Sequence, residues 1–216
     1  MITKFLERKY AKHKTENKKS VDRLSKIIKA GLEVFLEKGF EATSLNEVIE
    51  KSGGSLSTIY NYFDNKESFF KAVMDENSKI FRRKFEDKLK LNDSTDIREY
   101  LTKFGEIYLN IMFNPKIIKF YRLMLSDILR DNITPHGRIF LKNGLIGVNE
   151  ILDDFFLKNI NKFKCKNHHK LGVFFCFMLR EPYFCNAMFF GEKIDKTKQT
   201  EQIQEIVDLF LNGHLK

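Results

Sequence analysis

The chain has 216 residues, 43% of them hydrophobic and 31% charged, and carries a formal net charge of +9 at pH 7. A chain of this length can form one or two hydrophobic cores without disulfides or a structural metal. The charge favours an anionic partner but does not distinguish DNA, RNA and an acidic membrane surface. Three scattered cysteines make no disulfide framework, and no apolar run approaches the roughly 18 residues of a membrane helix. We therefore expect a cytoplasmic protein without a membrane span.

Residues 1–19 form a basic arm, in which seven lysines and arginines accompany two glutamates. Because the arm has little apolar periodicity, it can be a solvated segment. It can also follow DNA phosphates or enter a minor groove beside a reading helix, as N-terminal arms do in other DNA-binding folds. Both interpretations stay open.

A helix-turn-helix is predicted after a first helix that begins near Ser20. Ser44 followed by Glu47 is a capping-box pattern, which opens the second helix of the motif. Residues 52–54, Ser-Gly-Gly, then end that helix, because glycine adopts positive φ without steric cost.

The third helix is short, with Ser55 as its expected N-cap and Ile59 and Phe63 on its inner face. The outward-facing residues are candidate DNA readers: Ser55, Leu56, Ser57, Thr58, Tyr60 and Asn61. None of them is positively charged, so bidentate guanine recognition by arginine is unavailable from this helix. Specificity can come from hydroxyl and amide hydrogen bonds, from Leu56 against thymine methyl groups, or from DNA shape.

The remaining chain alternates apolar helical stripes with polar or proline-containing breaks, and it contains no strand pattern. Asp64-Asn65 can cap a long helix that runs to about Leu89. Lys66 lies in the first turn of this helix, where a positive charge is unfavourable against the helix dipole. A nearby DNA phosphate is the simplest explanation for a cation at this position. Further helices are predicted at 94–113, 115–131, 134–156, 170–190 with a kink at Pro182, and through an apolar stripe at 203–211; a polar loop is predicted at 162–167.

The segment TSLNEVIEKSGGSLSTIYNYFDNKE at residues 43–67 resembles the signature of TetR-family transcriptional repressors, and the likeness covers about residues 21–74. The resemblance implies an all-α protein with a helix-turn-helix DNA-binding domain at 20–74. It implies a larger helical ligand-binding and dimerisation domain at 75–216. A homodimer of this kind binds double-stranded DNA at an inverted-repeat operator.

The resemblance also assigns residues within the motif. Tyr60 and Tyr62 match the family's aromatic pair, and Thr58 and Lys66 match further DNA contacts. Ser44, at the start of the second helix, completes our set of candidate DNA-binding residues. Leu56 departs from the pattern, because many relatives have a cation or a polar group at that position.

Residues 112–130, 174–190 and 207–213 resemble stretches of efflux-pump repressors of this family such as CmeR. This likeness implies control of a multidrug efflux pump and a pocket for an amphipathic or aromatic inducer, with an anionic compound as one option. The candidate lining residues are Phe104, Tyr108, Met112, Phe140, Cys176, Phe177, Arg180 and Phe184. Arg180 stands out because a cation in an apolar helix needs a partner, which Glu181 or an anionic ligand could supply.

Dimerisation is expected through the last two helices, which the family pairs as a four-helix bundle. The terminal stripe has no remaining partner once the body is closed. The predicted dimer contacts are Ile203, Ile206, Val207, Phe210 and Leu211.

The sequence predicts no catalytic or metal-binding site. Cys165, His168 and His169 do not complete a closed tetrahedral zinc set, and we find no phosphate loop, nucleophile elbow or paired Glu-x-x-His motif. We therefore expect no metal, no cofactor and no enzyme activity. The competing hypotheses are a helical protein that binds RNA or an acidic partner through the basic arm, and a helical-bundle enzyme.

Overall fold

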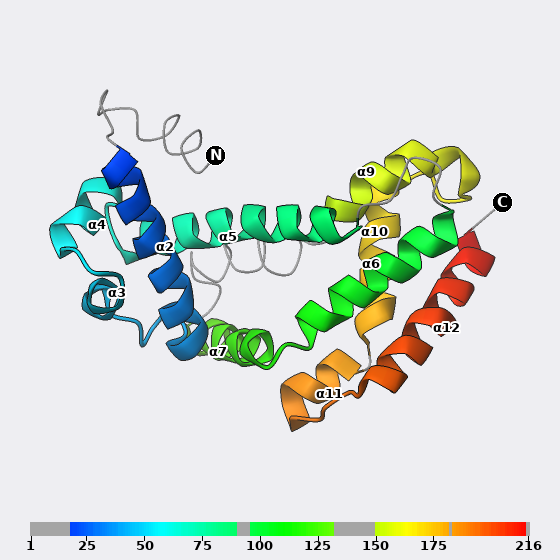
Figure 1. The fold of residues 1–216 in the computed structure, drawn as a ribbon. Helices are drawn as coiled ribbons and strands as arrows, with labels where there is room; N and C mark the ends of the chain where they lie inside the picture. Colours follow the sequence, from blue (N-terminus) through cyan, green and yellow to red (C-terminus); the bar gives the residue numbers. More distant parts are fainter. Residues whose placement is uncertain (1–17, 90–95, 132–149, 182, 215–216) are drawn as a thin grey trace.

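A computed structural model describes residues 18–89, 96–131, 150–181 and 183–214, and within these ranges the regular elements are helices without a strand (Figure 1). The helices are α2 (Lys18–Lys38), α3 (Leu45–Ser52), α4 (Leu56–Tyr62), α5 (Lys66–Leu89), α6 (Ile97–Met112), α7 (Pro115–Asp131), α9 (Glu150–Asn159), η2 (Ile160–Lys162), α10 (His168–Arg180), α11 (Tyr183–Phe190) and α12 (Lys196–His214). The all-α prediction is confirmed.

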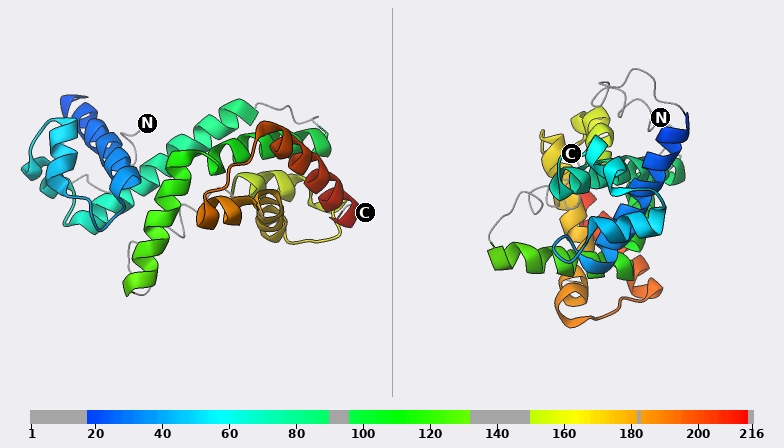
Figure 2. Two further views of the ribbon diagram at one scale, coloured as in Figure 1. Left: turned by 90° about the horizontal axis from the view of Figure 1, so that it is seen from below. Right: turned by 90° about the vertical axis from the view of Figure 1, so that its left-hand side faces the viewer.

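Helices α2, α3 and α4 form one end of the molecule and contain the predicted helix-turn-helix (Figure 1, Figure 2). The capping box at the start of α3 is present: the Asn46 N–H donates to Ser44 Oγ at 3.2 Å, and the Ser44 N–H donates to Glu47 Oε2 at 3.3 Å. Gly53 ends α3 with φ at 70°, a conformation that other residues rarely adopt. The local signals therefore place both helices of the motif where we expected them.

Ser55 precedes α4 as expected, but its side chain makes no N-cap hydrogen bond. Its Oγ instead lies 2.7 Å from Ser57 Oγ and 3.1 Å from Thr58 Oγ1. The predicted cap is therefore replaced by a small network of hydroxyl groups on the exposed face of the helix.

Aromatic rings hold this end of the molecule together. The Phe70 ring on α5 meets those of Phe35 and Phe40 edge-on, at centroid distances of 4.8 and 5.2 Å. Phe63 and Phe69 lie 5.2 Å apart, and all these rings are buried. Gly31 lets α5 approach α2, since a Cβ there would stand 2.5 Å from the Phe69 ring.

Two helices connect this end to the rest of the chain. Helix α5 is continuous across the domain boundary predicted at residues 74 and 75, and α7 also packs against α2 (Figure 2). On its other side α7 holds α11, because Arg122 donates from Nε to the Met188 carbonyl and from Nη2 to the Ala187 carbonyl, both at 2.6 Å.

The other end of the molecule is built from α6, α9, α10 and α12 around a second set of buried rings. Phe210 on α12 lies 5.0 Å from Phe175, and Phe156 on α9 lies 5.3 Å from Phe163. Phe163 is fully buried, although we predicted a polar loop at 162–167. The loop is polar on either side of this one residue, which anchors it to the core.

Two parts of the helix layout differ from the prediction. Helix α6 begins at Ile97 with Asp96 as its N-cap, later than the Asn92–Ser94 cap we expected. The single helix predicted at 170–190 is two helices, α10 and α11, and Gln202 Nε2 satisfies the carbonyls of Met178 and Glu181 at 3.3 and 3.1 Å where α10 ends. The prediction at 134–149 and residues 1–17 of the basic arm lie outside the described residues, while Lys18 and Lys19 belong to α2.

Candidate functional site

The predicted reading residues lie on and around α4, with unequal exposure. Ser55, Ser57, Tyr60 and Asn61 are exposed, and Tyr60 retains 55% of its surface. Leu56 is partly buried and packs against the core, so it does not simply face outward as we expected, and Tyr62 is partly buried there too. Thr58 is also partly buried.

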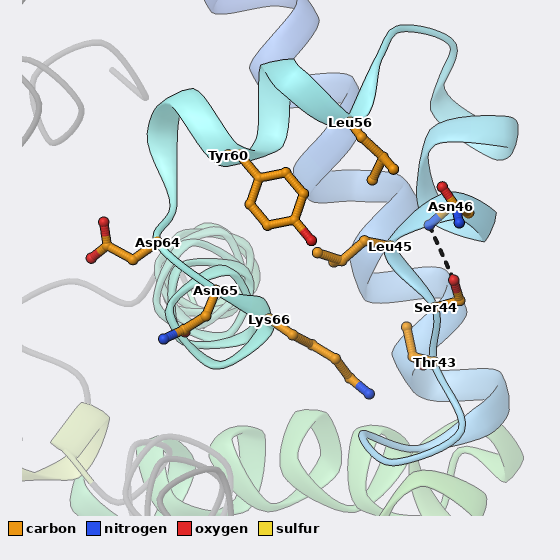
Figure 3. A pocket seen from close by; sticks show the side chains of 9 residues that line it. All are labelled: Thr43, Ser44, Leu45, Asn46, Leu56, Tyr60, Asp64, Asn65 and Lys66. Atoms are coloured by element: carbon orange, nitrogen blue, oxygen red, sulfur yellow. Dashed lines mark hydrogen bonds between the residues drawn. The ribbon is translucent and has the colours of Figure 1, made fainter.

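An open hollow of about 330 Å³ lies where the outer face of α4 meets the N-terminal ends of α3 and α5 (Figure 3). Leu45, Leu56 and Tyr60 form its apolar side, and their side chains converge. The rest of the lining is polar and consists of Thr43, Ser44, Asn46, Asp64, Asn65 and Lys66. The hollow thus combines two helix N-termini, a cation and hydroxyl groups, which are the usual elements of a phosphate contact.

Lys66 has protein partners in this structure. Its Nζ donates to the Glu41 carbonyl at 3.0 Å and lies 4.5 Å from the centre of the Phe40 ring. These contacts also explain a cation at the start of α5, so a DNA phosphate is not needed to account for Lys66. The side chain is held at the rim of the hollow, where a phosphate could still approach it.

Both ends of the molecule match known family models. The model "Bacterial regulatory proteins, tetR family" matches residues 27–73, and the model "AefR-like transcriptional repressor, C-terminal domain" matches residues 99–213. The chain belongs to the TetR family of transcriptional regulators.

Relatives of this TetR-family regulator agree with that assignment. The HTH-type transcriptional repressor ComR of Escherichia coli K12 is 39% identical over 71 residues, which is 33% of each chain, so the match spans only about a third of that relative's length. Among solved structures, a TetR-family transcriptional regulator from Mesorhizobium loti MAFF303099 has a TM-score of 0.78 at 21% identity, covering 93% of this chain and 100% of that one.

Two further structures share the TetR fold. The flavonoid-responsive regulator FrrA has a TM-score of 0.72 at 20% identity, covering 90% of this chain and 97% of its own. FadR from Bacillus subtilis, in complex with stearoyl-CoA, has a TM-score of 0.62 at 18% identity, covering 88% and 98%. Both matching family models describe transcription regulators, and neither describes an enzyme.

The body of this TetR-family regulator contains a buried cation, Arg180, among the predicted pocket residues. The residue is 7% exposed, and its guanidinium carbon lies 4.1 Å from the centre of the Phe177 ring and 5.2 Å from that of Phe184. Its Nε lies 3.3 Å from Glu181 Oε1, but the geometry makes this an ion pair without a hydrogen bond. Glu181 therefore serves as the predicted counter-ion only in part.

Neutral polar groups surround Arg180. Burial raises the pKa of Tyr121 to about 12 and that of Tyr108 well above its usual range, and the positive charge of Arg180 opposes both shifts. Burial likewise raises the pKa of the Cys176 thiol, again against Arg180. The two tyrosines and the cysteine thus stay protonated at neutral pH, and hydroxyl donors accompany the guanidinium.

The other predicted pocket residues are partly brought together. Phe104 and Tyr108 on α6 stack at a centroid distance of 5.7 Å, and Met112 on α6 and Phe184 on α11 are buried. Phe177 is 48% exposed, and Phe140 lies outside the described residues. Sequence reasoning missed Tyr121, whose ring meets Phe184 edge-on at 5.3 Å, because a tyrosine in an apolar stripe gives no signal of its own.

The predicted dimer stripe requires a correction. Ile203, Val207, Phe210 and Leu211 are buried within the chain, where α12 packs against α6 and α10, and Ile206 is partly buried. The premise that the stripe has no partner in its own chain is therefore wrong. The large apolar side chains that remain exposed on the last helices are Phe174 and Phe177 on α10, Phe189 and Phe190 on α11, and Leu209 on α12.

The histidines and cysteines of the TetR-family chain form no metal cluster within the described ranges. His169 Nδ1 lies 3.0 Å from Asp153 Oδ2, which joins α10 to α9. The cysteines carry no disulfide: Cys176 is buried, Cys165 is partly buried and Cys185 is exposed. No helix among the described residues has the length and apolarity that a bilayer crossing requires.

Proposed function

We propose that this protein is a homodimeric repressor that binds an inverted-repeat operator and is released by an amphipathic inducer, and that it controls a multidrug efflux pump. The observation that carries the DNA-binding part is the exposed face of α4 beside the hollow rimmed by Lys66. A helix-turn-helix places the exposed polar residues of its recognition helix in the major groove, while neighbouring groups contact the DNA phosphates.

The dimer is proposed to form through the outer faces of α10 and α12. Phe174, Phe177 and Leu209 expose about half or more of their surfaces there, and exposed apolar side chains grouped on neighbouring helices favour association. A two-fold dimer would place its two α4 helices on successive major grooves about 34 to 36 Å apart, or a multiple of that distance. An inverted-repeat operator follows from this symmetry.

The inducer is proposed to carry an anionic group that Arg180 binds. A buried guanidinium whose Nε has no hydrogen-bond partner is costly, and an anion would offset this cost. The hydroxyl groups of Tyr108 and Tyr121 would add donors, and the surrounding rings would bind an apolar portion. FadR holds stearoyl-CoA, an anionic amphipathic compound, which indicates that this fold can accommodate such a ligand.

Release is proposed to run through α5 and α7, because both helices pack against α2. Tyr121 and Arg122 on α7 contact α11, so a ligand at Arg180 would act on the helix that also supports the helix-turn-helix. The ligand shifts DNA affinity only by its differential affinity for the two arrangements of the dimer.

Selection of DNA from a random pool by the purified full-length protein tests this function. We expect enrichment of an inverted repeat whose two half-sites both contribute to affinity. Enrichment of no sequence, or of a single asymmetric half-site bound by a monomer, would overturn the proposal. Adding bile salts to the bound complex then tests release.

A further inference from the structure

The DNA-facing surface of this protein is poor in groups that recognise guanine. Between residues 43 and 65 the only cation is Lys51. Its Nζ lies 3.1 Å from Glu33 and 3.6 Å from Glu37, both on α2, so its charge is engaged by that helix. Since arginine and lysine make the usual bidentate contact with guanine, this surface lacks the usual means of recognising a G·C pair.

Two of the three acidic residues of the same segment, Glu47 and Asp64, are poorly placed to contact cytosine. Glu47 is engaged by Lys38 at 2.6 Å and by the Ser44 N–H, and it closes the capping box. Asp64 follows the C-terminal end of α4, whereas the N-terminal residues of a recognition helix contact base edges. The third, Glu50 on α3, is exposed but does not line the hollow, so the hollow offers cytosine N4 no carboxylate near the start of α4.

The groups near the start of α4 suit A·T pairs instead. Leu56 is partly exposed and lines the hollow with Leu45, and Figure 3 shows its side chain directed into the hollow. Asn46, an exposed amide at the start of α3, lines the same hollow. An apolar side chain matches the 5-methyl group of thymine, and an asparagine amide matches the N6 and N7 edge of adenine.

We propose that the operator half-site is recognised through thymine 5-methyl groups packed against Leu56, with Asn46 on the edge of a neighbouring adenine. This inference rests on the proposed DNA-binding function and specifies what its reading surface selects. The DNA sugar-phosphate backbone is positioned by Lys66, Tyr60 and Ser44, whereas Leu56 supplies the preference for a base.

The test replaces thymine by deoxyuridine, which lacks only the methyl group, at each position of the selected operator in turn. For the wild-type protein we expect at least one position per half-site where this change weakens binding about fourfold, the equivalent of about 0.8 kcal/mol for one buried methyl group. Because the DNA is altered and the protein is not, folding of a variant does not enter this measurement.

A Leu56→Ala protein completes the cycle. It should bind the thymine operator more weakly than wild type does and should no longer distinguish thymine from deoxyuridine at that position. Leu157→Ala, the same substitution at an exposed leucine on α9, outside the DNA-binding end, is the matched control and should keep the discrimination. Thermal unfolding checks that both variants fold.

The outcomes separate the two proposals. If the random pool yields no enriched DNA, the proposed function fails. If an operator is enriched but deoxyuridine is tolerated everywhere, or if Leu56→Ala still distinguishes the two bases, recognition through the methyl group is refuted while DNA binding stands.

Discussion

The ring of Phe69 on α5 occupies the space that a side chain at Gly31 on α2 would need, since a Cβ at Gly31 would lie 2.5 Å from Phe69 Cζ. Phe69 is fully buried and cannot easily withdraw. Gly31→Ala should therefore lower the free energy of unfolding by about 1 to 3 kcal/mol through overpacking, despite the better helix propensity of alanine. Gly213→Ala, where nothing lies within 4 Å, is the control and should stay within about 0.5 kcal/mol. Equal urea unfolding curves for the two variants would contradict this account of the contact.

Neighbouring residues of α12 should respond oppositely to the same substitution. Phe210 is fully buried, so Phe210→Asp should unfold the chain, at a cost of several kcal/mol. Leu209 is 61% exposed, so Leu209→Asp should preserve the helical circular dichroism and weaken self-association at least tenfold. Sedimentation velocity that still shows a tight Leu209→Asp dimer would place the interface elsewhere.

Removal of the Lys66 charge should weaken binding to every DNA sequence alike. Each lost phosphate contact should lower the slope of log affinity against log salt by roughly 0.9, or by roughly 1.8 for the two copies in a dimer. Lys66→Arg keeps the charge and serves as the control for Lys66→Ala. Because Lys66 also bonds the Glu41 carbonyl, thermal unfolding must accompany the titrations. An unchanged salt slope in a folded Lys66→Ala protein would exclude the phosphate contact.

Arg180 should distinguish inducers by charge. Arg180→Met removes the charge at similar length, and it should weaken the binding of a bile salt at least tenfold while changing that of a neutral analogue less than threefold. Isothermal titration of both compounds into wild type and variant measures this difference. Equal losses for the two compounds would mean that Arg180 only supports the fold. If release is allosteric, operator DNA should weaken inducer binding by the same factor by which the inducer weakens DNA binding.

The buried tyrosines should make the protein sensitive to alkali. Tyr121 has a folded-state pKa of about 12, raised by burial, whereas an unfolded tyrosine ionises near 10. A pKa that is higher in the folded state contributes stability below pH 10, and this contribution is lost as pH rises from about 10 to 12. In Tyr121→Phe the free energy of unfolding should therefore fall less over that range. A titration followed by tyrosinate absorbance near 295 nm should also show one fewer tyrosine that ionises near pH 12 in this variant.

Signals confined to a few neighbouring residues were readable from the sequence. The Ser44–Glu47 capping box and the positive φ of Gly53 depend only on local geometry, and both appear as predicted. Arg180 was found because a cation in an apolar helix conflicts with its surroundings, and the structure indeed buries it. Such conflicts can be recognised without knowledge of the tertiary contacts.

Errors arose where tertiary contacts decide the outcome. An apolar stripe on α12 suits an interface and a core equally well, and only the packing of α6 and α10 shows that Val207 and Phe210 face inward. Phe163 lies in a polar stretch, and its ring packs against Phe156 and against Phe210, which is distant in sequence. Residues that close a core from a loop leave no periodic pattern to detect.

The exposed thiol of Cys185 provides a native attachment point for a fluorophore or spin label. It lies on α11, the helix that Arg122 holds, while Cys176 is buried and Cys165 partly buried, so modification should favour a single site. A hydrogen bond to Glu181 raises the pKa of the Cys185 thiol, which makes mildly alkaline buffer the better choice for labelling. In a homodimer, two such labels would act as a molecular ruler for the separation of the subunits, with no engineered cysteine required.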